Sequence, residues 1–386
     1  MKHFKILFLI LISIFCCSCI EAKTGKVGFT SSKEVTKKLI VSEFIQQQIT
    51  ENLFILKSVN YNTNIGVFIG SESLLLIDPM GGFNNHASLL ETIKQLSDKP
   101  IKYVVNTHHH LDHSGASGFF KELGAVIISH ENAQYSNALT DVTFKNTYSI
   151  DLGDETVTLF HNVSHTFDDV LVYFNKNNTV FMGDTYMTNS FPHSYYGGGS
   201  NGHLSIIDKA LSLGNEETII IPAHGNLSSN KTELAAYRDN SVKWFNRIAQ
   251  LYNEGNTSDV IADDYQIQRL SSVFNAGRDV SKQNIQRTLD KTISIEHVES
   301  TTLSEEHLRA LEGSFTYSNG QVDEVIFLNR KLILQSKGKY IYEIIPLSNT
   351  KFHIKGQFPN KHLTFSDDLQ QFIFFDGKEN LNARRK

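Results

Sequence analysis

In the first part of the chain, short apolar runs typical of strands alternate with segments whose apolar residues recur at helical spacing. Short apolar runs separated by turn residues predict strands, and the first two, in residues 52–60 and 63–82, are typical of paired strands. Apolar residues recur at helical spacing over 84–98, and a strand over 101–105 follows. The same alternation predicts a helix near 114–123, strands over 125–130, 156–161, 170–175 and 179–184, a helix over 203–214 and a strand over 218–225. Strands with interspersed helices indicate a layered α/β body.

The pattern changes after about residue 230. Residues 231–300 are helix-like and polar on one side, which predicts a helical extension. From about residue 305 to 380, short strands alternate aromatic with polar residues, and Gly or Asn-Gly marks the turns. This pattern predicts a separate small antiparallel β-domain. The α/β body itself is expected over about residues 45–230.

The first 22 residues are typical of an export signal. Lys2 and Lys5 precede an apolar stretch from Ile6 to Phe15, which is too short for a spanning helix. A buried N-terminal helix is the alternative. If the signal is cleaved, the exported chain loses two lysines and no acidic residue, so it becomes more acidic than the −5 of the full chain.

All three cysteines lie at this cleavage zone. The stretch Cys16-Cys17-Ser18-Cys19 resembles a bacterial lipobox, although such motifs usually have leucine where Cys16 stands. The resemblance implies a periplasmic or membrane-anchored lipoprotein that contacts a membrane surface through lipidated Cys19. The alternative is simple secretion after cleavage near Ala22. Either way the folded part has no cysteine, so any metal site must use His and carboxylate ligands.

Charge and composition narrow the range of partners. Apolar residues make up 40% and charged residues 20% of the 386 positions, as expected of an ordinary globular core. The chain has no basic block and no basic patch with interleaved aromatics, so no nucleic-acid partner is expected. A small-molecule substrate is the expected partner, and the sequence leaves the oligomeric state open.

A cluster of histidines follows the predicted strand 101–105. In residues 106–115, NTHHHLDHSG, the spacing H-x-H-x-D-H places His108, His110, Asp112 and His113 on one loop. These residue types bind zinc at about 2.0–2.2 Å, with three or four ligands for each ion. Four residues cannot complete two sites, and further candidates stand at other strand ends: His165, Asp184 and His224. Functional groups in a layered α/β body collect at such boundaries.

These motifs together resemble the metallo-β-lactamase superfamily. The resemblance covers about residues 45–230, with Asp78 at the position of a supporting aspartate, and it implies a four-layer αββα sandwich with two metals at one edge. In this family pattern His108, His110 and His165 would hold the first metal, and Asp112, His113 and His224 the second. Asp184 would bridge both metals, whereas His109 is not expected to bind either.

The resemblance implies an exported metal-dependent hydrolase with two divalent metal ions. Zn²⁺ is the expected metal, and Mn²⁺ or Fe²⁺ suits the same ligands. A metal-bridging hydroxide would attack an ester, lactone, thioester or amide. A β-lactam is not favoured, because β-lactamases of this superfamily usually have Cys or Ser near the position of Asp184. The alternatives are a non-hydrolytic iron-dependent redox member of the same fold and a binding module with an inactive site.

Three residues are predicted to act on the substrate. Asp112 would orient the nucleophile or move its proton, and Tyr186 and His203 are chosen from the loop 185–203 that follows Asp184. The same loop carries further candidates for the pocket wall: His193, Tyr195, Tyr196 and Asn201. The C-terminal β-domain has no cluster of titratable residues, and its His307, His353 and His362 are expected to be structural.

Overall fold

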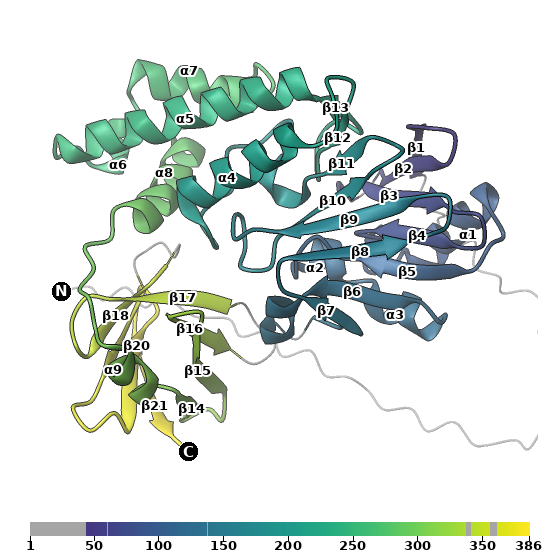
Figure 1. Cartoon of the computed structure of the whole chain (residues 1–386). Coiled ribbons are helices and arrows are strands. Elements are labelled where there is room, and N and C mark those ends of the chain that lie inside the picture. The colour runs from purple at the N-terminus through teal and green to yellow at the C-terminus, as the bar shows by residue number, and fades with distance from the viewer. Residues whose placement is uncertain (1–43, 60, 137, 337–340, 356–360) are drawn as a thin grey trace, which may run out of the picture. The chain divides into compact units, whose positions relative to one another are not determined.

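Two β-sheets form the centre of the α/β body in the computed structural model of the chain (Figure 1). The structure describes residues 44–386 except 60, 137, 337–340 and 356–360. The predicted export signal and Cys19 lie outside the described residues. Among the helices that are described, none is long and apolar enough to cross a membrane.

The first sheet has seven strands in sequence order. β1 to β4 run antiparallel, whereas β4, β5, β6 and β7 run parallel. The strands are β1 (Phe44–Gln48), β2 (Leu53–Ser58), β3 (Ile65–Ile69), β4 (Leu74–Ile77), β5 (Ile101–Val105), β6 (Val126–His130) and β7 (Val142–Phe144). Parallel neighbours end at the same edge, so the loops that follow β4 and β5 emerge together.

The second sheet has six strands in the order β13-β12-β11-β10-β9-β8. Its pairings are antiparallel except for β11 with β12. The strands are β8 (Thr147–Asp151), β9 (Thr156–His161), β10 (Val170–Phe174), β11 (Thr179–Phe181), β12 (Ile219–Ile221) and β13 (Ser229–Asn230).

Successive side chains along a strand of the first sheet pack into two separate hydrophobic cores. On β4, Leu75 and Ile77 pack between the two sheets, whereas Leu74 and Leu76 pack against the helices outside. The period of two follows from the pleat, which turns successive side chains to opposite faces. The outer helices are α1 (His86–Leu96) and α3 (Ser117–Glu122), whose buried apolar residues belong to the same outer core.

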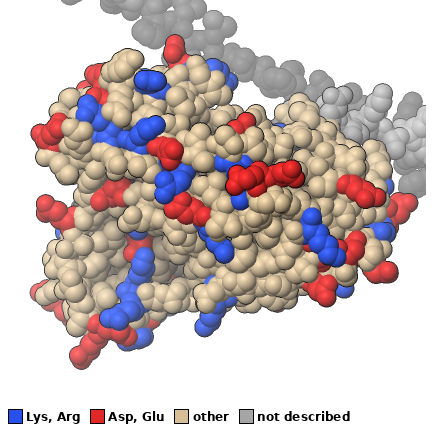
Figure 2. Space-filling model, turned by 45° about the horizontal axis from the view of Figure 1, so that its top comes forward, with Lys and Arg blue, Asp and Glu red and all other residues tan. Residues whose placement is uncertain are grey.

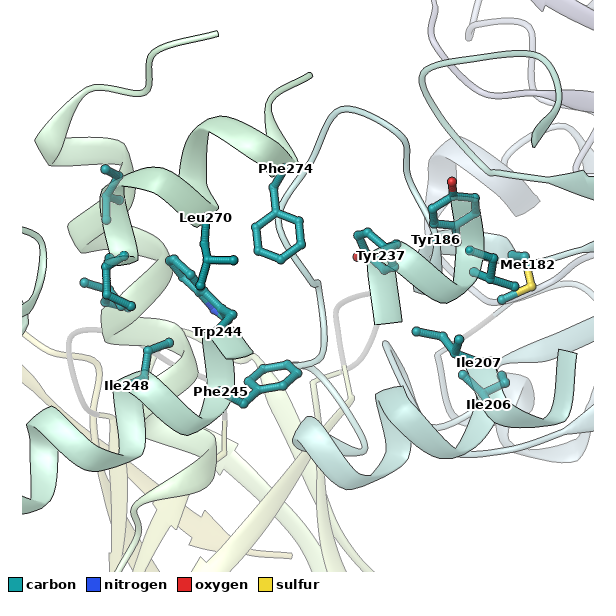
Figure 3. Packing of buried hydrophobic residues seen from close by; sticks show 14 of the residues in the cluster. Met182, Tyr186, Ile206, Ile207, Tyr237, Trp244, Phe245, Ile248, Leu270 and Phe274 are labelled. Atoms are coloured by element: carbon teal, nitrogen blue, oxygen red, sulfur yellow. The ribbon is translucent and has the colours of Figure 1, made fainter. Parts of the chain in front are cut away.

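Helices also cover the outer face of the second sheet. Leu171, Val180 and Ile220 of that sheet share a core with α4 (Gly199–Ser212) and α5 (Lys231–Asn253). Figure 3 shows part of this core, with Ile206 and Ile207 near Met182 and Tyr186, and with Trp244 near Leu270. The four layers are therefore helix, sheet, sheet and helix, which confirms the predicted αββα sandwich.

The helical extension begins with α5 and contains three further helices: α6 (Ser258–Ile261), α7 (Tyr265–Phe274) and α8 (Lys282–Glu296). The side chain of Asn230 caps α5 by accepting a hydrogen bond from the Glu233 N–H at 2.9 Å. Trp244 of α5 is fully buried against Phe274 of α7. The extension therefore adds to the outer core of the second sheet.

The C-terminal strands close into an antiparallel barrel. After the short α9 (Glu305–Ala310), eight strands pair in sequence order, and β14 also pairs with β21. They are β14 (Gly313–Tyr317), β15 (Val322–Leu328), β16 (Lys331–Ser336), β17 (Ile341–Pro346), β18 (Lys351–Ile354), β19 (His362–Phe365), β20 (Gln371–Phe375) and β21 (Asn380–Arg385). Aromatic residues such as Phe315 and Phe372 fill the interior. The predicted small β-domain is confirmed, and its closure is a finding of the structure.

Two predicted helices have different bounds in the structure. The helix expected near 114–123 is divided into α2 (Leu111–Ser114) and α3, with Gly115 between them. A Cβ at Gly115 would collide with the carbonyl oxygen of Leu111, so the close approach favours glycine. The helix expected from residue 203 begins at Gly199, because the glycine-rich segment before His203 already forms its first turn.

Candidate metal centre

The parallel pair β4 and β5 positions the histidine-rich loop. Ile77 and Val105 are register partners at the ends of the two strands, so Asp78 lies beside the start of the loop. The Thr107 N–H donates to Asp78 Oδ1 at 2.7 Å, and the Thr107 hydroxyl donates to Asp78 Oδ2 at 2.7 Å. Asp78 has φ +46°, a left-handed conformation that aspartate tolerates better than most residues do.

The structure brings all seven predicted ligands together in two groups. Within each group, one donor atom of each residue lies within 4.8 Å of the others. The first group is His108, His110, His165 and Asp184, and the second is Asp112, His113, Asp184 and His224. Asp184 is shared by both. Its position on the 3₁₀ helix η2 (Gly183–Thr185) directly after β11 places it between the two groups.

The distances between donor atoms match the spacing of ligands around a metal ion. Asp184 Oδ1 lies 3.1 Å from His113 Nε2 and 3.1 Å from His224 Nε2, and Asp184 Oδ2 lies 3.4 Å from His165 Nε2. Asp112 Oδ2 lies 3.6 Å from His113 Nε2 and 3.5 Å from His224 Nε2. Bonds of about 2.0–2.1 Å in a tetrahedron place neighbouring ligand atoms about 3.3 Å apart.

The outward-facing nitrogens of four imidazoles are already occupied. In each ring Nδ1 lies within hydrogen-bond distance of a group outside the two ligand groups, which fixes the ring orientation and leaves Nε2 facing inward. The pairs are His108 with Thr107 Oγ1 at 3.2 Å, His113 with Asp78 Oδ2 at 2.9 Å, His165 with His193 O at 2.8 Å and His224 with Asn62 O at 3.0 Å.

Several inward-facing atoms are buried and make no well-aligned hydrogen bond. Within the described part of the chain, His108 Nε2 has no partner, and His113 Nε2 and Asp184 Oδ1 make no well-aligned hydrogen bond although they lie 3.1 Å apart. A buried polar atom without a partner is costly, so each such atom in a folded protein requires an explanation. A divalent cation in each group would satisfy these atoms, and the nitrogen and oxygen donor set suits Zn²⁺, Mn²⁺ or Fe²⁺. The residues therefore fit a pair of metal ions.

Electrostatic interactions differ between the two groups. Burial lowers the pKa of His108 and of His165. Burial also opposes a charged His113, but the carboxylates of Asp78, Asp184 and Asp112 outweigh it and raise the pKa of His113 well above its usual value. In the same way Asp184 and Asp112 outweigh burial and raise the pKa of His224 to about 9. The carboxylates of the second group thus favour positive charge there, supplied by protons or by a cation.

His109 belongs to neither candidate group among the described residues. Its Nδ1 lies 2.7 Å from Asp168 Oδ1, and both side chains are almost fully buried. Although burial opposes the Asp168 carboxylate, His109 outweighs it and holds the pKa of Asp168 below its usual value. This pair connects the histidine-rich loop to the loop that carries His165. It therefore helps to hold the two loops of the first ligand group together.

Three glycines allow the start of α4 to approach the loop that carries His165. A Cβ on Gly197 would lie 2.5 Å from the carbonyl oxygen of Thr166, and a Cβ on Gly198 or Gly202 would collide with the carbonyl oxygen of Val163. The Gly198 N–H also donates to the carbonyl of Ser164 at 2.5 Å. The glycine-rich segment therefore holds the His165 loop in place.

A cavity of about 1050 Å³ opens beside the two ligand groups. Ligands from both groups line it, together with residues from earlier and later in the chain. The ligands are His110, Asp112, His165 and Asp184, and other lining residues are Tyr61, Phe83, Asn189, Phe191, His193, Tyr195, Tyr196, Phe274, Asn284, Arg287 and Lys291. The predicted pocket residues His193, Tyr195 and Tyr196 are thus at the cavity, and the side chains from α7 and α8 were missed.

Tyr186 and His203 lie elsewhere. The Tyr186 hydroxyl is 3.0 Å from Ser229 Oγ, and its ring borders a separate cavity of about 240 Å³. His203 is fully buried on α4 and packs against Tyr237 and Phe245. Neither residue lines the large cavity. Their predicted action on a substrate gains no support from these positions, and neither does a pocket role for the exposed Asn201.

The histidines of the C-terminal β-domain are accounted for by local packing. His307 Nε2 lies 2.7 Å from the Asn349 carbonyl oxygen. His353 is buried, and the His362 ring packs against Phe375 with centroids 5.0 Å apart. None belongs to either candidate metal group among the described residues.

Comparison with known proteins identifies similar sequences and structures. Residues 59–224 match the model of a family described as the metallo-beta-lactamase superfamily. A hydroxyacylglutathione hydrolase of Pelagibacter ubique is 34% identical over 104 residues, which are 24% of this chain and 40% of that protein. Metallo-beta-lactamase IND-1 of Chryseobacterium indologenes is 28% identical over 195 residues, covering 47% of this chain and 81% of that protein.

Among solved structures, a metallo-beta-lactamase from Pontibacter korlensis is 20% identical, with a TM-score of 0.45, and covers 51% of this chain and 100% of that chain. The match to the Pelagibacter ubique protein spans less than half of that relative's length. The matched family segment ends at residue 224, so it contains all seven candidate ligands but neither the helical extension nor the barrel.

Proposed function

Because residues 59–224 belong to the metallo-β-lactamase superfamily of metal-dependent hydrolases, we propose that this chain uses two metal ions to hydrolyse a small molecule. The observation that carries the proposal is the position of Asp184. Its two carboxylate oxygens face different ligand groups, Oδ1 toward His113 and His224 and Oδ2 toward His165. A binding module with an inactive site would have no need for two complete groups that share one carboxylate.

Two divalent cations, held by the two ligand groups, would supply a nucleophile near neutral pH and would polarise a carbonyl oxygen. Zinc is the metal that we propose. Asp112 is the residue of this chain best placed to act on the nucleophile, because it lines the cavity and its side chain is 38% exposed. Burial alone would favour its neutral form, but His113 and His224 hold the pKa of Asp112 well below its usual value. The ionised Asp112 carboxylate would orient the attacking water by accepting a hydrogen bond from it.

The reaction that we propose is hydrolysis of an ester, lactone, thioester or amide. The Pelagibacter ubique relative is named for hydroxyacylglutathione, which is a thioester, and this supports the thioester first. Other relatives are named metallo-beta-lactamases, so a β-lactam substrate is included in the test. Figure 2 shows basic and acidic side chains interspersed on the face that it draws, which favours a small-molecule substrate over nucleic acid.

The test is a substrate panel on the zinc-loaded and the manganese-loaded full chain. Chromogenic thioester, lactone, ester, amide and β-lactam substrates are compared for the wild type and for Asp112→Asn. We expect one acyl class to be turned over, and we expect Asp112→Asn to reduce that turnover by at least about 10–100-fold. No turnover of any class, together with tightly bound coloured iron in the purified protein, would favour the redox alternative instead.

We further propose that the protein is exported and anchored at a membrane surface through Cys19. The support is the sequence alone: two lysines, a short apolar stretch and the Ser18-Cys19 pair. Lipidation adds about 0.8 kcal/mol of membrane affinity for each buried CH₂, so one acyl chain binds marginally and several anchor stably.

A further inference from the structure

Helix α8 brings two basic side chains to the cavity beside the candidate metal centre. Arg287 and Lys291 are four residues apart, so they lie one turn from each other on the same face of the helix. Both line the cavity that His110, Asp112 and Asp184 also line. The helix lies outside the family segment 59–224, so these cations are supplied by the extension of this chain.

Aromatic rings hold the Lys291 ammonium close to the first ligand group. Lys291 Nζ lies 3.2 Å from the Tyr196 hydroxyl, 4.6 Å from the centroid of the Tyr195 ring and 5.3 Å from that of the Tyr196 ring. The Tyr196 ring in turn contacts His110 and His165, each with ring centroids 5.5 Å apart. One aromatic ring therefore separates this ammonium from two of the candidate metal ligands.

Neither cation is ion-paired with a carboxylate in the described part of the chain. The nearby acids of α8 are engaged elsewhere: Glu296 accepts hydrogen bonds from Ser200 N and Oγ at 2.5 and 2.7 Å, and Asp290 borders a different cavity. Asp279 is the remaining carboxylate at the cavity besides the candidate ligands, and it is exposed.

The surroundings of Lys291 make an unpaired ammonium unfavourable. Burial lowers the pKa of Lys291, and the neighbouring Arg287 lowers it further. Two adjacent cations that lack a carboxylate are stabilised when an anion binds between them. Guanidinium and ammonium donors together suit a carboxylate, sulfate or phosphate, and the planar guanidinium adds two parallel hydrogen bonds.

We propose that Arg287 and Lys291 form an anion subsite that binds a negatively charged group of the substrate, set apart from the bond that is hydrolysed. This proposal rests on the proposed function, because it places the reacting acyl group at the two ligand groups. The substrate is then an acyl compound with a remote carboxylate, sulfate or phosphate. Phe191, Tyr195 and Phe274 line the same cavity and provide apolar surface for the part between the two ends.

The first test compares matched substrates on the zinc-loaded full chain. One substrate carries a terminal carboxylate and the other its neutral amide, with the same scissile bond and leaving group. The variants are Lys291→Met and Arg287→Met, and Lys282→Met is the control. Lys282 lies on the same helix, but it is paired with Asp259 and Asp263 on the surface.

We expect each subsite variant to raise KM for the anionic substrate at least tenfold while kcat stays near wild type. The neutral substrate and the Lys282→Met control should show no such change. Metal content and Tm, measured for every variant, establish that the fold is intact. Equal effects on the two substrates, or no effect on either, would overturn the anion subsite.

A binding measurement separates this proposal from the proposed function. Glutarate, sulfate and phosphate are titrated calorimetrically into the zinc-loaded wild type and into zinc-loaded Lys291→Met. An affinity that falls at least tenfold in the variant supports the subsite even if no substrate of the panel is hydrolysed, and the preferred probe identifies the anionic group. Equal affinities of all three probes for the two proteins would refute the subsite, whatever the hydrolysis results are.

Discussion

Nδ1 of His113 lies 2.9 Å from Oδ2 of Asp78, and both side chains are buried. The same carboxylate accepts two hydrogen bonds from Thr107 at the start of the histidine-rich loop. Asp78 therefore fixes both the path of the loop and the ring of His113, and His113 Nε2 is left facing Asp184. A single buried carboxylate therefore orients a ligand of the second group before any cation binds.

Asp78→Asn is expected to weaken the second metal site. An amide in place of the carboxylate cannot accept hydrogen bonds from both Thr107 and His113 through two oxygens. Loss of such a partner typically costs about 10–100-fold in metal affinity. Zinc titration against a competing chelator measures the change. Asp323→Asn is the matched control, because Asp323 is also buried and accepts a hydrogen bond from Tyr317 at 2.7 Å, but in the barrel. Equal zinc affinity of the two variants would refute this role for Asp78.

Zinc binding at the second group is expected to become stronger as the pH rises. The pKa of His224 is raised to about 9 and that of His113 is also raised, so without a cation both rings hold protons at neutral pH. A ligating ring must be neutral, so zinc has to displace these protons, and its apparent affinity rises with pH until about pH 9. The pKa values of His108 and His165 are lowered, so the first group should respond less.

Proton release measures this effect directly. Metal-free protein in weakly buffered solution at pH 7.5 should release protons as zinc is added, and His224→Ala should release fewer. Zinc affinities measured from pH 6 to pH 9 provide the second readout. A flat pH profile for both sites would contradict the assignment of His113 and His224.

Local pattern predicted β2 to β6 and β9 to β12 of the two sheets, but it did not predict β7 or β8. The seven candidate ligands came from the same pattern together with the family resemblance. Buried strands such as β4 are apolar throughout, and their ends mark where His or Asp leaves the sheet. The polar strand β1, FIQQQ, and the two-residue β13 carry no such signal, because their positions depend on pairing with β2 and β12. Their existence follows from tertiary contacts alone.

The cavity was harder to predict than the ligands. Lys291 lies more than 100 residues beyond Asp184 in the sequence, and only packing of α8 brings both to one cavity. Tyr186 and His203 were selected for their closeness to Asp184 in sequence, yet both side chains turn into the core of α4 and α5. The direction of each side chain is set by such packing, which sequence spacing does not reveal.

Gly198→Ala is expected to destabilise the fold and to loosen the loop that carries His165. The added methyl group collides with the carbonyl of Val163, and such overpacking typically costs about 1–3 kcal/mol. Thermal unfolding and zinc affinity of the first site are the two readouts. Gly118→Ala is the control, because a Cβ there meets no atom within 4 Å. If Gly198→Ala had the same Tm and zinc affinity as Gly118→Ala, the close approach would be unimportant.

Cys19→Ala is expected to move the protein from the membrane fraction to the soluble fraction while its hydrolytic activity is retained. The acyl groups that would anchor the chain depend on this thiol. Fractionation of cells followed by immunoblotting measures the distribution, and Cys17→Ala is the matched control. Wild-type protein that is already soluble and begins near Ala22 would replace the lipoprotein hypothesis with simple secretion.

The metal content of the purified protein tests the central claim most directly. The full chain, prepared in metal-replete buffer, is analysed by elemental analysis and native mass spectrometry beside His224→Ala. Two complete ligand groups that share Asp184 predict close to two ions per wild-type chain and close to one for His224→Ala. A wild-type content that stays near zero under these conditions would contradict the account.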